Sequence, residues 1–127
     1  MPGAGSRTAS RLARAIGVAL LAEFSALFVA DHVHAASQTR FWNLTSGTVS
    51  EFRLAPAGSN AFGANQCVND KDGTVDHDER LVITGVAPGR YDAKLAYTTG
   101  RICFARNLEV KEGKVFSIDD HDLKDCK

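Results

Sequence analysis

The chain of 127 residues contains none of the short motifs that identify the common enzyme classes. It has no Cys-X-X-Cys pair, no Gly-X-Ser-X-Gly elbow, no phosphate-binding loop and no glycine-rich dinucleotide fingerprint. It also has no excess of one charge, because 15 Lys and Arg residues are balanced by 15 Asp and Glu residues. A balanced chain has no electrostatic case for nucleic-acid binding. We therefore expect a non-catalytic protein whose partner is not a nucleic acid.

Long hydrophobic runs are absent as well. The apolar stretch at residues 15–30 is shorter than the roughly 20 residues that cross a bilayer, and Glu23 interrupts it. Three arginines precede this stretch, with no acidic residue among them. A positive segment followed by a short apolar segment is typical of a cleavable secretory signal. We expect a signal peptide over residues 1–35, and a membrane-anchor helix is the alternative.

Small residues at the end of this segment predict the cleavage site. Val33 and Ala35 occupy the −3 and −1 positions if the cut follows Ala35, and a cut after Ala36 is the alternative. There is no adjacent arginine pair to support twin-arginine export, and no cysteine follows the apolar stretch as it would in a lipoprotein. We expect a periplasmic or secreted protein that meets the membrane only transiently, through its signal peptide.

The exported part, residues 36–127, is one domain with a thin core. Its 92 residues carry 12 basic and 13 acidic side chains, a net charge of −1. Apolar residues recur with a period of two, which predicts strands, and no segment has a helical period. Short strands joined by Gly-rich turns predict an all-β fold, a small antiparallel β-sandwich of about six to seven strands. The predicted strands are residues 39–44, 49–54, 80–84, 90–98, 102–110 and 115–118.

The alternation also predicts which side chains share a face. The first two strands are expected to pair as a hairpin, with Phe52 and Leu54 of the second pointing inward. Phe62 is expected to cover one end of the sandwich. In the first strand, Trp42 and Leu44 are expected to share a face. In residues 90–98, one face is expected to hold Tyr91, Ala93, Leu95 and Tyr97, and the other Asp92 and Lys94. In residues 102–110, the shared face is expected to hold the even positions Ile102, Phe104, Leu108 and Val110.

The three cysteines of the exported part, Cys67, Cys103 and Cys126, permit one disulfide and leave one thiol. Three pairings are possible, and we favour Cys103 with Cys126 because that bond would tie the C-terminus to a strand. Closing a loop of about 24 residues stabilises a domain by about 3 kcal/mol in the chain-entropy estimate. Cys67 is then a free thiol or an intermolecular link.

A long polar segment at residues 57–78 is unusual for so small a domain, and long loops are often functional. Part of it resembles a calcium loop of the EF-hand type, with Gly73 at the sharp turn. Val68 stands where the first carboxylate ligand belongs, so a true EF-hand is not expected. A solvated turn is the favoured interpretation, and a looser Ca²⁺ site is the alternative. Its candidate ligands are Asp70, Asp72, Asp76 and Glu79.

Two histidines lie between carboxylates, His77 in the long loop and His121 near the C-terminus. Such sites bind transition metals weakly, and neither has the spacing of a known metal motif. Cys67 could act as a nucleophile only with a partnered base, for which His77 is the nearest candidate in sequence. We expect no catalytic residue and no bound cofactor, Ca²⁺ excepted.

Several short motifs follow one another along the exported part. They are Asn43-Leu44-Thr45, Pro56-Ala57-Gly58, Phe62-Gly63-Ala64-Asn65, Gly89-Arg90-Tyr91-Asp92, and Gly100-Arg101 with Cys103.

In this order the motifs resemble a group of small exported proteobacterial proteins of unknown function. That group has the pattern Asn-X-Thr, Ser-Pro-Ala-Gly, Trp-Gly-X-Asn, Tyr-Asp and a late Cys, often behind a twin-arginine signal. Here Ala55 and Phe62 replace the Ser and the Trp, and the twin arginine is missing.

The resemblance implies a β-sandwich and a non-enzymatic role, and it transfers no catalytic residue. We therefore expect a binding or structural module of the bacterial envelope, whose partner is an envelope protein or ligand that the sequence does not identify. A calcium-binding exported domain is the alternative.

Overall fold

The computed structural model describes residues 37–127, which fall within one compact unit at the C-terminal end of the chain. The signal peptide predicted over residues 1–35 lies outside the described residues. Within the described part, no helix is long and apolar enough to cross a membrane.

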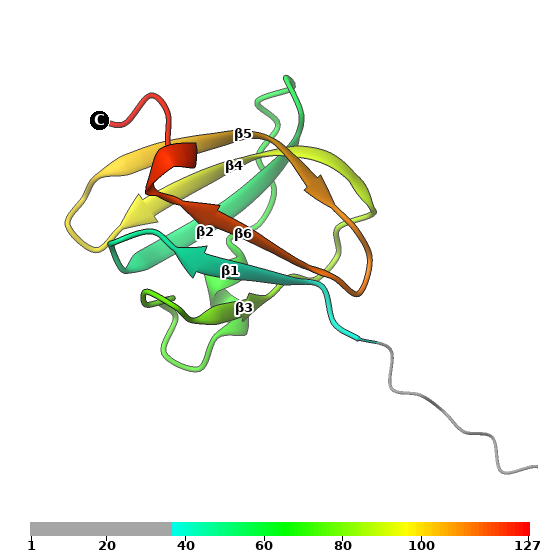
Figure 1. Cartoon of the computed structure of the whole chain (residues 1–127), viewed down its shortest axis with the longest axis horizontal. Coiled ribbons are helices and arrows are strands. Elements are labelled where there is room, and N and C mark those ends of the chain that lie inside the picture. Colours follow the sequence, from blue (N-terminus) through cyan, green and yellow to red (C-terminus); the bar gives the residue numbers. More distant parts are fainter. Residues whose placement is uncertain (1–36) are drawn as a thin grey trace, which may run out of the picture. The chain divides into compact units, whose positions relative to one another are not determined.

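The expected all-β fold is confirmed (Figure 1). Six strands make up the described part, and the only helical segments there are short 3-10 turns. The elements are β1 (Arg40–Leu44), β2 (Val49–Pro56), η2 (Gln66–Asn69), β3 (Arg80–Val82), β4 (Gly89–Tyr97), β5 (Ile102–Val110), β6 (Val115–Asp119) and η3 (Asp120–Asp122).

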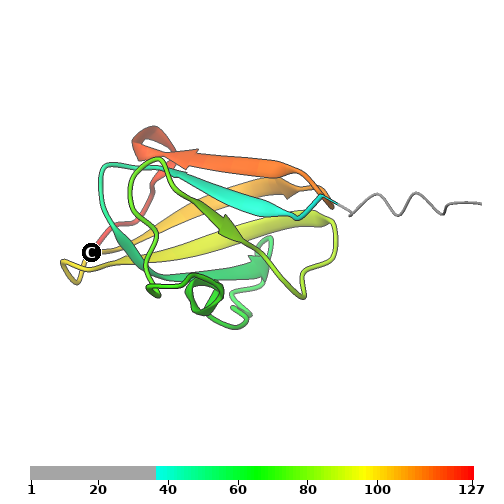
Figure 2. The same cartoon turned by 90° about the horizontal axis from the view of Figure 1, so that it is seen from below.

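The strands form two three-stranded sheets, in the orders β3-β1-β6 and β2-β4-β5, which Figure 2 shows as two layers. Apolar side chains from both sheets meet between the layers. Phe41 of β1 stacks on Phe52 of β2 with ring centroids 4.1 Å apart, and Phe116 of β6 packs against both. All the pairs are antiparallel except β1 with β6, which run parallel. The alternating pattern cannot predict that pair, because it carries no information on strand direction.

The predicted hairpin between the first two strands is wrong. β1 and β2 belong to different sheets, and residues 45–48 carry the chain from one layer to the other. The crossing is held by Asn43, which is fully buried at the end of β1. Its Nδ2 donates to the carbonyls of Gly47 at 3.0 Å and Val75 at 2.9 Å, and its Oδ1 accepts from the amide and hydroxyl of Thr45. A turn tied to a side chain in this way does not close a two-stranded ladder.

Trp42 and Leu44 do share a face of β1, but the buried face is the other one. Phe41 and Asn43 point into the core and are fully buried. Trp42 lies on the outer face, where the Arg80 guanidinium stacks 4.1 Å from its ring and its Nε1 donates to Asp78 at 2.9 Å. The sequence pattern placed Trp42 and Leu44 on one face but did not predict which face of β1 is buried, because alternation does not register such polar partners.

The inward faces of β2 and β4 are confirmed, and the face predicted for β5 is wrong in its first half. Cys103 and Ala105 are fully buried, whereas Ile102 and Phe104 lie on the other face. The β4–β5 register shifts further along, where Asn107 has a φ of 57°. The bulge reverses the alternation, and Val110, an even position, is buried.

The C-terminal tail covers the outer edge of β5. Its backbone pairs with the first residues of the strand, Phe104 with Lys124 and Ile102 with Lys127. The disulfide predicted between Cys103 and Cys126 is confirmed and joins the tail to β5 between these two pairs. In Figure 1 the red tail crosses to the edge of β5.

Candidate functional site

The long loop, residues 57–79, closes the opposite side of the sandwich, where β2 and β3 are the edge strands. It packs η2 against both of these strands. The amide of Gly63 donates to the carbonyl of Leu54 at 2.9 Å, which holds the first part of the loop beside β2. Asn65 then caps η2, and its Oδ1 accepts from the amides of Phe52 and Cys67, both at 3.0 Å.

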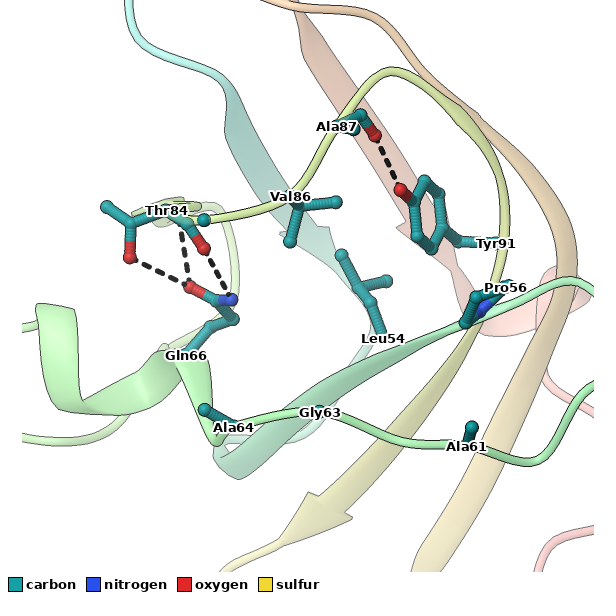
Figure 3. A pocket seen from close by; sticks show the side chains of 11 residues that line it. Leu54, Pro56, Ala61, Gly63, Ala64, Gln66, Thr84, Val86, Ala87 and Tyr91 are labelled. Atoms are coloured by element: carbon teal, nitrogen blue, oxygen red, sulfur yellow. Dashed lines mark hydrogen bonds between the residues drawn. The ribbon is translucent and has the colours of Figure 1, made fainter.

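Gln66 links this loop to the segment after β3. Its Nε2 donates to the carbonyl of Thr84 at 3.0 Å, and its Oε1 accepts from the amide of Thr84 at 3.0 Å (Figure 3). Asn69 donates from Nδ2 both to Gln66 Oε1 and to the carbonyl of Val82, each at 2.9 Å. The side-chain amides thus take the place of a neighbouring strand, which an exposed edge otherwise lacks.

A hollow of about 380 Å³ lies between this loop and the turn after β3, and we call it the edge pocket. Its volume falls within the range of small-ligand sites, about 300–1,000 Å³. In Figure 3 the loop runs beside β2 on one side, and the turn that carries Val86 and Ala87 lies across from it. The lining consists of Leu54, Pro56, Ala61, Gly63, Ala64, Gln66, Thr84, Gly85, Val86, Ala87 and Tyr91.

The lining of the edge pocket is mostly apolar. Small and aliphatic groups dominate it, and the polar groups of Gln66 and Thr84 are bonded to each other. Tyr91 is the only titratable residue in the lining, and its hydroxyl donates to the carbonyl of Ala87 at 2.6 Å. The pocket is therefore a small recess with a mainly apolar lining.

Three of the short sequence motifs meet around the edge pocket. Pro56, Gly63 and Tyr91 each come from a different motif, and all three line it. Asp92, the residue after Tyr91, accepts from the amide of Gly58 at 2.9 Å. This bond joins the motif of Tyr91 to the motif of Pro56. Sequence reasoning found these motifs but did not place them in one site. The signal that could have done so was their shared content of Gly, Pro and small residues.

Asp92 is the buried carboxylate of this region, with an exposed fraction of 4%. The sequence placed it on the outer face of its strand, which is correct, but predicted no burial there. Burial by itself would raise its pKa. The hydrogen bonds from the Gly58 and Asn107 amides, together with the Arg106 guanidinium at 3.4 Å, outweigh burial and hold the pKa of Asp92 below its ordinary value. Asp92 is therefore ionised at neutral pH and fixes both the start of the long loop and the bulge in β5.

Three of the four carboxylates proposed as calcium ligands accept local hydrogen bonds, and Asp72 takes part through its backbone amide. Asp70 accepts from the amide of Asp72, Glu79 from the amide of Asp76, and Asp76 from the hydroxyl of Thr48. Within residues 37–127, no three His, Cys, Asp or Glu side chains gather where they could hold a metal ion. Calcium binding by this loop stays a prediction.

The histidines and Cys67 also remain apart from the edge pocket. His77 Nδ1 lies 2.9 Å from the carbonyl of Thr45, and His121 is exposed beside Asp119. Cys67 is a free thiol with an exposed fraction of 1%, so it is not available for an intermolecular link. Burial raises its pKa to about 11, and nearby Asp70 adds to this effect. A thiol of that pKa is protonated at neutral pH and lacks the thiolate that a nucleophile requires.

Phe62, expected to cover one end of the sandwich, lies over the outer face of β5 instead. Its ring centroid is 5.8 Å from that of Phe104. This contact anchors the exposed part of the long loop beside the edge pocket.

No protein-family model, curated protein or solved structure matches this chain.

Proposed function

We propose that residues 36–127 form an exported, non-catalytic domain that binds another component of the bacterial envelope through the edge pocket. The observation that carries this proposal is the convergence of Pro56, Gly63 and Tyr91, from three separate motifs, on one apolar recess. A recess of this kind accepts an apolar side chain or a small apolar group.

Export is supported from two independent directions. The first 35 residues have the order of a secretory signal, and the domain contains the Cys103–Cys126 disulfide. Disulfides persist in oxidising compartments such as the periplasm and are rare where thiols are kept reduced. The test is mass spectrometry of the protein from fractionated cells. We expect an N-terminus at Ala36 in the periplasmic or secreted fraction, and an intact N-terminus in the membrane fraction would support the anchor instead.

The binding proposal is tested by filling the pocket. Ala64 is exposed and lines the edge pocket, so Ala64→Leu places three additional carbons in the recess without touching the core. Ala57→Leu is the matched control, because Ala57 is equally exposed but does not line the pocket. Both variants should fold and melt like the unmodified domain.

Each form of the domain is immobilised and exposed to the same envelope extract. We expect one component to be retained by the unmodified domain and by Ala57→Leu, and to be depleted at least about tenfold by Ala64→Leu, a loss of about 1.4 kcal/mol of binding free energy. Equal retention by all three forms would place the binding surface elsewhere. If the unmodified domain retains no component of the extract, the proposed envelope partner does not exist and the proposal is wrong.

A further inference from the structure

A second hollow, of about 270 Å³, lies at the other end of β4, and we call it the turn pocket. Tyr91 near the start of β4 lines the edge pocket, and Tyr97 at the end of β4 lines the turn pocket. Three segments distant in sequence build it: the turn after β1, the β4–β5 hairpin and the C-terminal tail. Its lining includes Ser46, Tyr97, Thr99, Arg101, Asp120 and Leu123.

Tyr97 gives the turn pocket an apolar wall. Its exposed fraction is 6%, and its hydroxyl donates to Thr45 Oγ1 at 3.0 Å. Its ring packs directly on the backbone of Gly47, where a Cβ would come within 2.6 Å of the ring. Only glycine fits at this position, so the wall is fixed by the turn and not by a flexible side chain.

Two opposite charges border the pocket without neutralising each other. Asp120 Oδ1 accepts from the amide of Ser46 at 3.0 Å, and its second oxygen makes no hydrogen bond within residues 37–127. Arg101 forms no ion pair with Asp120 or with any other carboxylate of the described part. Both charges act on the same hydroxyl: burial raises the pKa of Tyr97, Asp120 raises it further, and Arg101 lowers it.

We propose that the turn pocket binds a small zwitterion, a free α-amino acid, with its carboxylate on Arg101 and its ammonium group on Asp120. A guanidinium matches a carboxylate in a forked, two-bond geometry, and a carboxylate oxygen accepts readily from an ammonium group. The aliphatic side chain of the ligand then lies against Tyr97 and Leu123. A ligand with only one charge would leave one of the two bordering charges without a partner.

The C-terminal disulfide supports one wall of this site. Asp120 and Leu123 belong to the segment that Cys126 fastens to Cys103, and Lys124 pairs with Phe104 just beyond them. Reduction of the disulfide therefore releases the wall that carries the negative charge. The turn pocket shares no lining residue with the edge pocket, so its occupancy is independent of the function proposed there.

The experiment is titration of the ¹⁵N-labelled domain with L-leucine, followed by amide chemical shifts. L-leucinamide lacks the carboxylate and N-acetyl-L-leucine lacks the ammonium group, so each removes one of the two proposed contacts. We expect saturable shifts in residues 46–48, 98–101 and 120–123 with L-leucine at millimolar concentration. Each one-charge analogue should bind at least about tenfold more weakly.

Variants assign the two contacts to their residues. Arg101→Gln should weaken L-leucine binding and should make the domain bind L-leucine and L-leucinamide equally. Asp120→Asn should make the domain bind L-leucine and N-acetyl-L-leucine equally. An asparagine at 120 can still accept from Ser46, so the wall is kept. Arg90→Gln is the matched control, because Arg90 is exposed at the opposite end of β4.

Two results would overturn the proposal. One is the absence of shifts in these three segments at tens of millimolar L-leucine. The other is equal binding of L-leucine, both one-charge analogues and an uncharged sugar such as glucose, which would show a hydroxyl-binding surface with no use for the two charges.

Discussion

The two open sides of the sandwich are closed by different chemistry. On the side of β2 and β3, the side-chain amides of Asn65, Gln66 and Asn69 hold the long loop, beside two backbone contacts to β2 at Gly63 and Val75. On the side of β5, the tail is held by backbone pairing and by a disulfide. Paired strands lie about 4.8 Å apart and leave no room between them, whereas a side-chain amide spans a wider gap. The edge pocket lies on this amide-closed side, between the long loop and the turn after β3.

The largest expected effect is on the disulfide-closed side. Reduction, or Cys103→Ala with Cys126→Ala, should lower the free energy of unfolding by about 3 kcal/mol, because the bond closes a loop of about 24 residues in the unfolded chain. Denaturant unfolding of the oxidised domain, the reduced domain and the double variant measures this loss. The reduced domain and the variant should agree. An unchanged free energy would mean that backbone pairing alone holds the tail.

Asp92 connects the two sides, and its loss should be the next largest effect. Its carboxylate binds Gly58 at the start of the long loop and Arg106 in β5, and Arg106 also pairs with Asp125 of the tail at 3.7 Å. Asp92→Asn keeps one acceptor oxygen, so it leaves either the Gly58 or the Asn107 amide without its acceptor and removes the negative charge beside Arg106; it should cost about 2 kcal/mol. Denaturant unfolding at neutral pH measures the loss, and Asp72→Asn is the exposed control.

The contribution of Asp92 to the free energy of unfolding should depend on pH. The folded-state pKa of Asp92 is lower than its unfolded-state value, so its contribution is complete above about pH 4 and is lost as the pH falls through the folded-state pKa. We expect the difference in stability between the unmodified domain and Asp92→Asn to shrink steadily below about pH 4. A difference that is constant down to about pH 2 would contradict the assignment of Asp92 as an ionised, hydrogen-bonded group.

A smaller effect is expected on the amide-closed side. Gln66→Ala removes both hydrogen bonds to the backbone of Thr84, but Thr84 is exposed and water can replace part of what is lost. We expect a loss of about 1 to 2 kcal/mol, with Gln38→Ala, an exposed position, as the control. Melting of the two variants measures it. A loss as large as that of the disulfide would remove the contrast between the two sides.

Calcium should have the smallest effect. Full occupancy at 100 times the dissociation constant would add about 2.7 kcal/mol of stability. The carboxylates of Asp70, Asp76 and Glu79 already accept hydrogen bonds within the protein and do not gather in one site, so we expect an unchanged melting temperature at millimolar Ca²⁺. An upward shift that Asp76→Asn abolishes would establish the calcium site.

The sequence predicted most reliably the parts of the fold that depend on a simple alternation. The inward residues of β2 and β4 follow a strict period of two, and the Cys103–Cys126 bond followed from the need to hold the tail. The sequence did not predict which face of β1 is buried. Asn43 lies in the core because its hydrogen bonds are satisfied there, and Trp42 lies outside because Arg80 and Asp78 bind it.

The candidate sites were harder to predict than the fold. The edge pocket depends on which segments meet, and the bond between Gln66 and Thr84 joins residues 18 positions apart through geometry that no local pattern records. The turn pocket needs the tail to lie beside a turn 74 positions earlier, where Ser46 meets Asp120. The long loop between β2 and β3 lies where the sequence predicted it. Its role in closing an edge was not visible from its acidic residues, which drew attention to calcium instead.

The most direct test of the account compares the two sides in one experiment. The ¹⁵N-labelled domain is mixed with envelope extract, and its amide shifts are followed residue by residue. We predict that the amides of Gly63, Ala64, Val86 and Ala87 shift or broaden, that the tail beside β5 does not, and that Ala64→Leu removes the effect. Shifts confined to the tail and β5, or shifts that survive Ala64→Leu unchanged, would contradict the assignment of the edge pocket as the binding site.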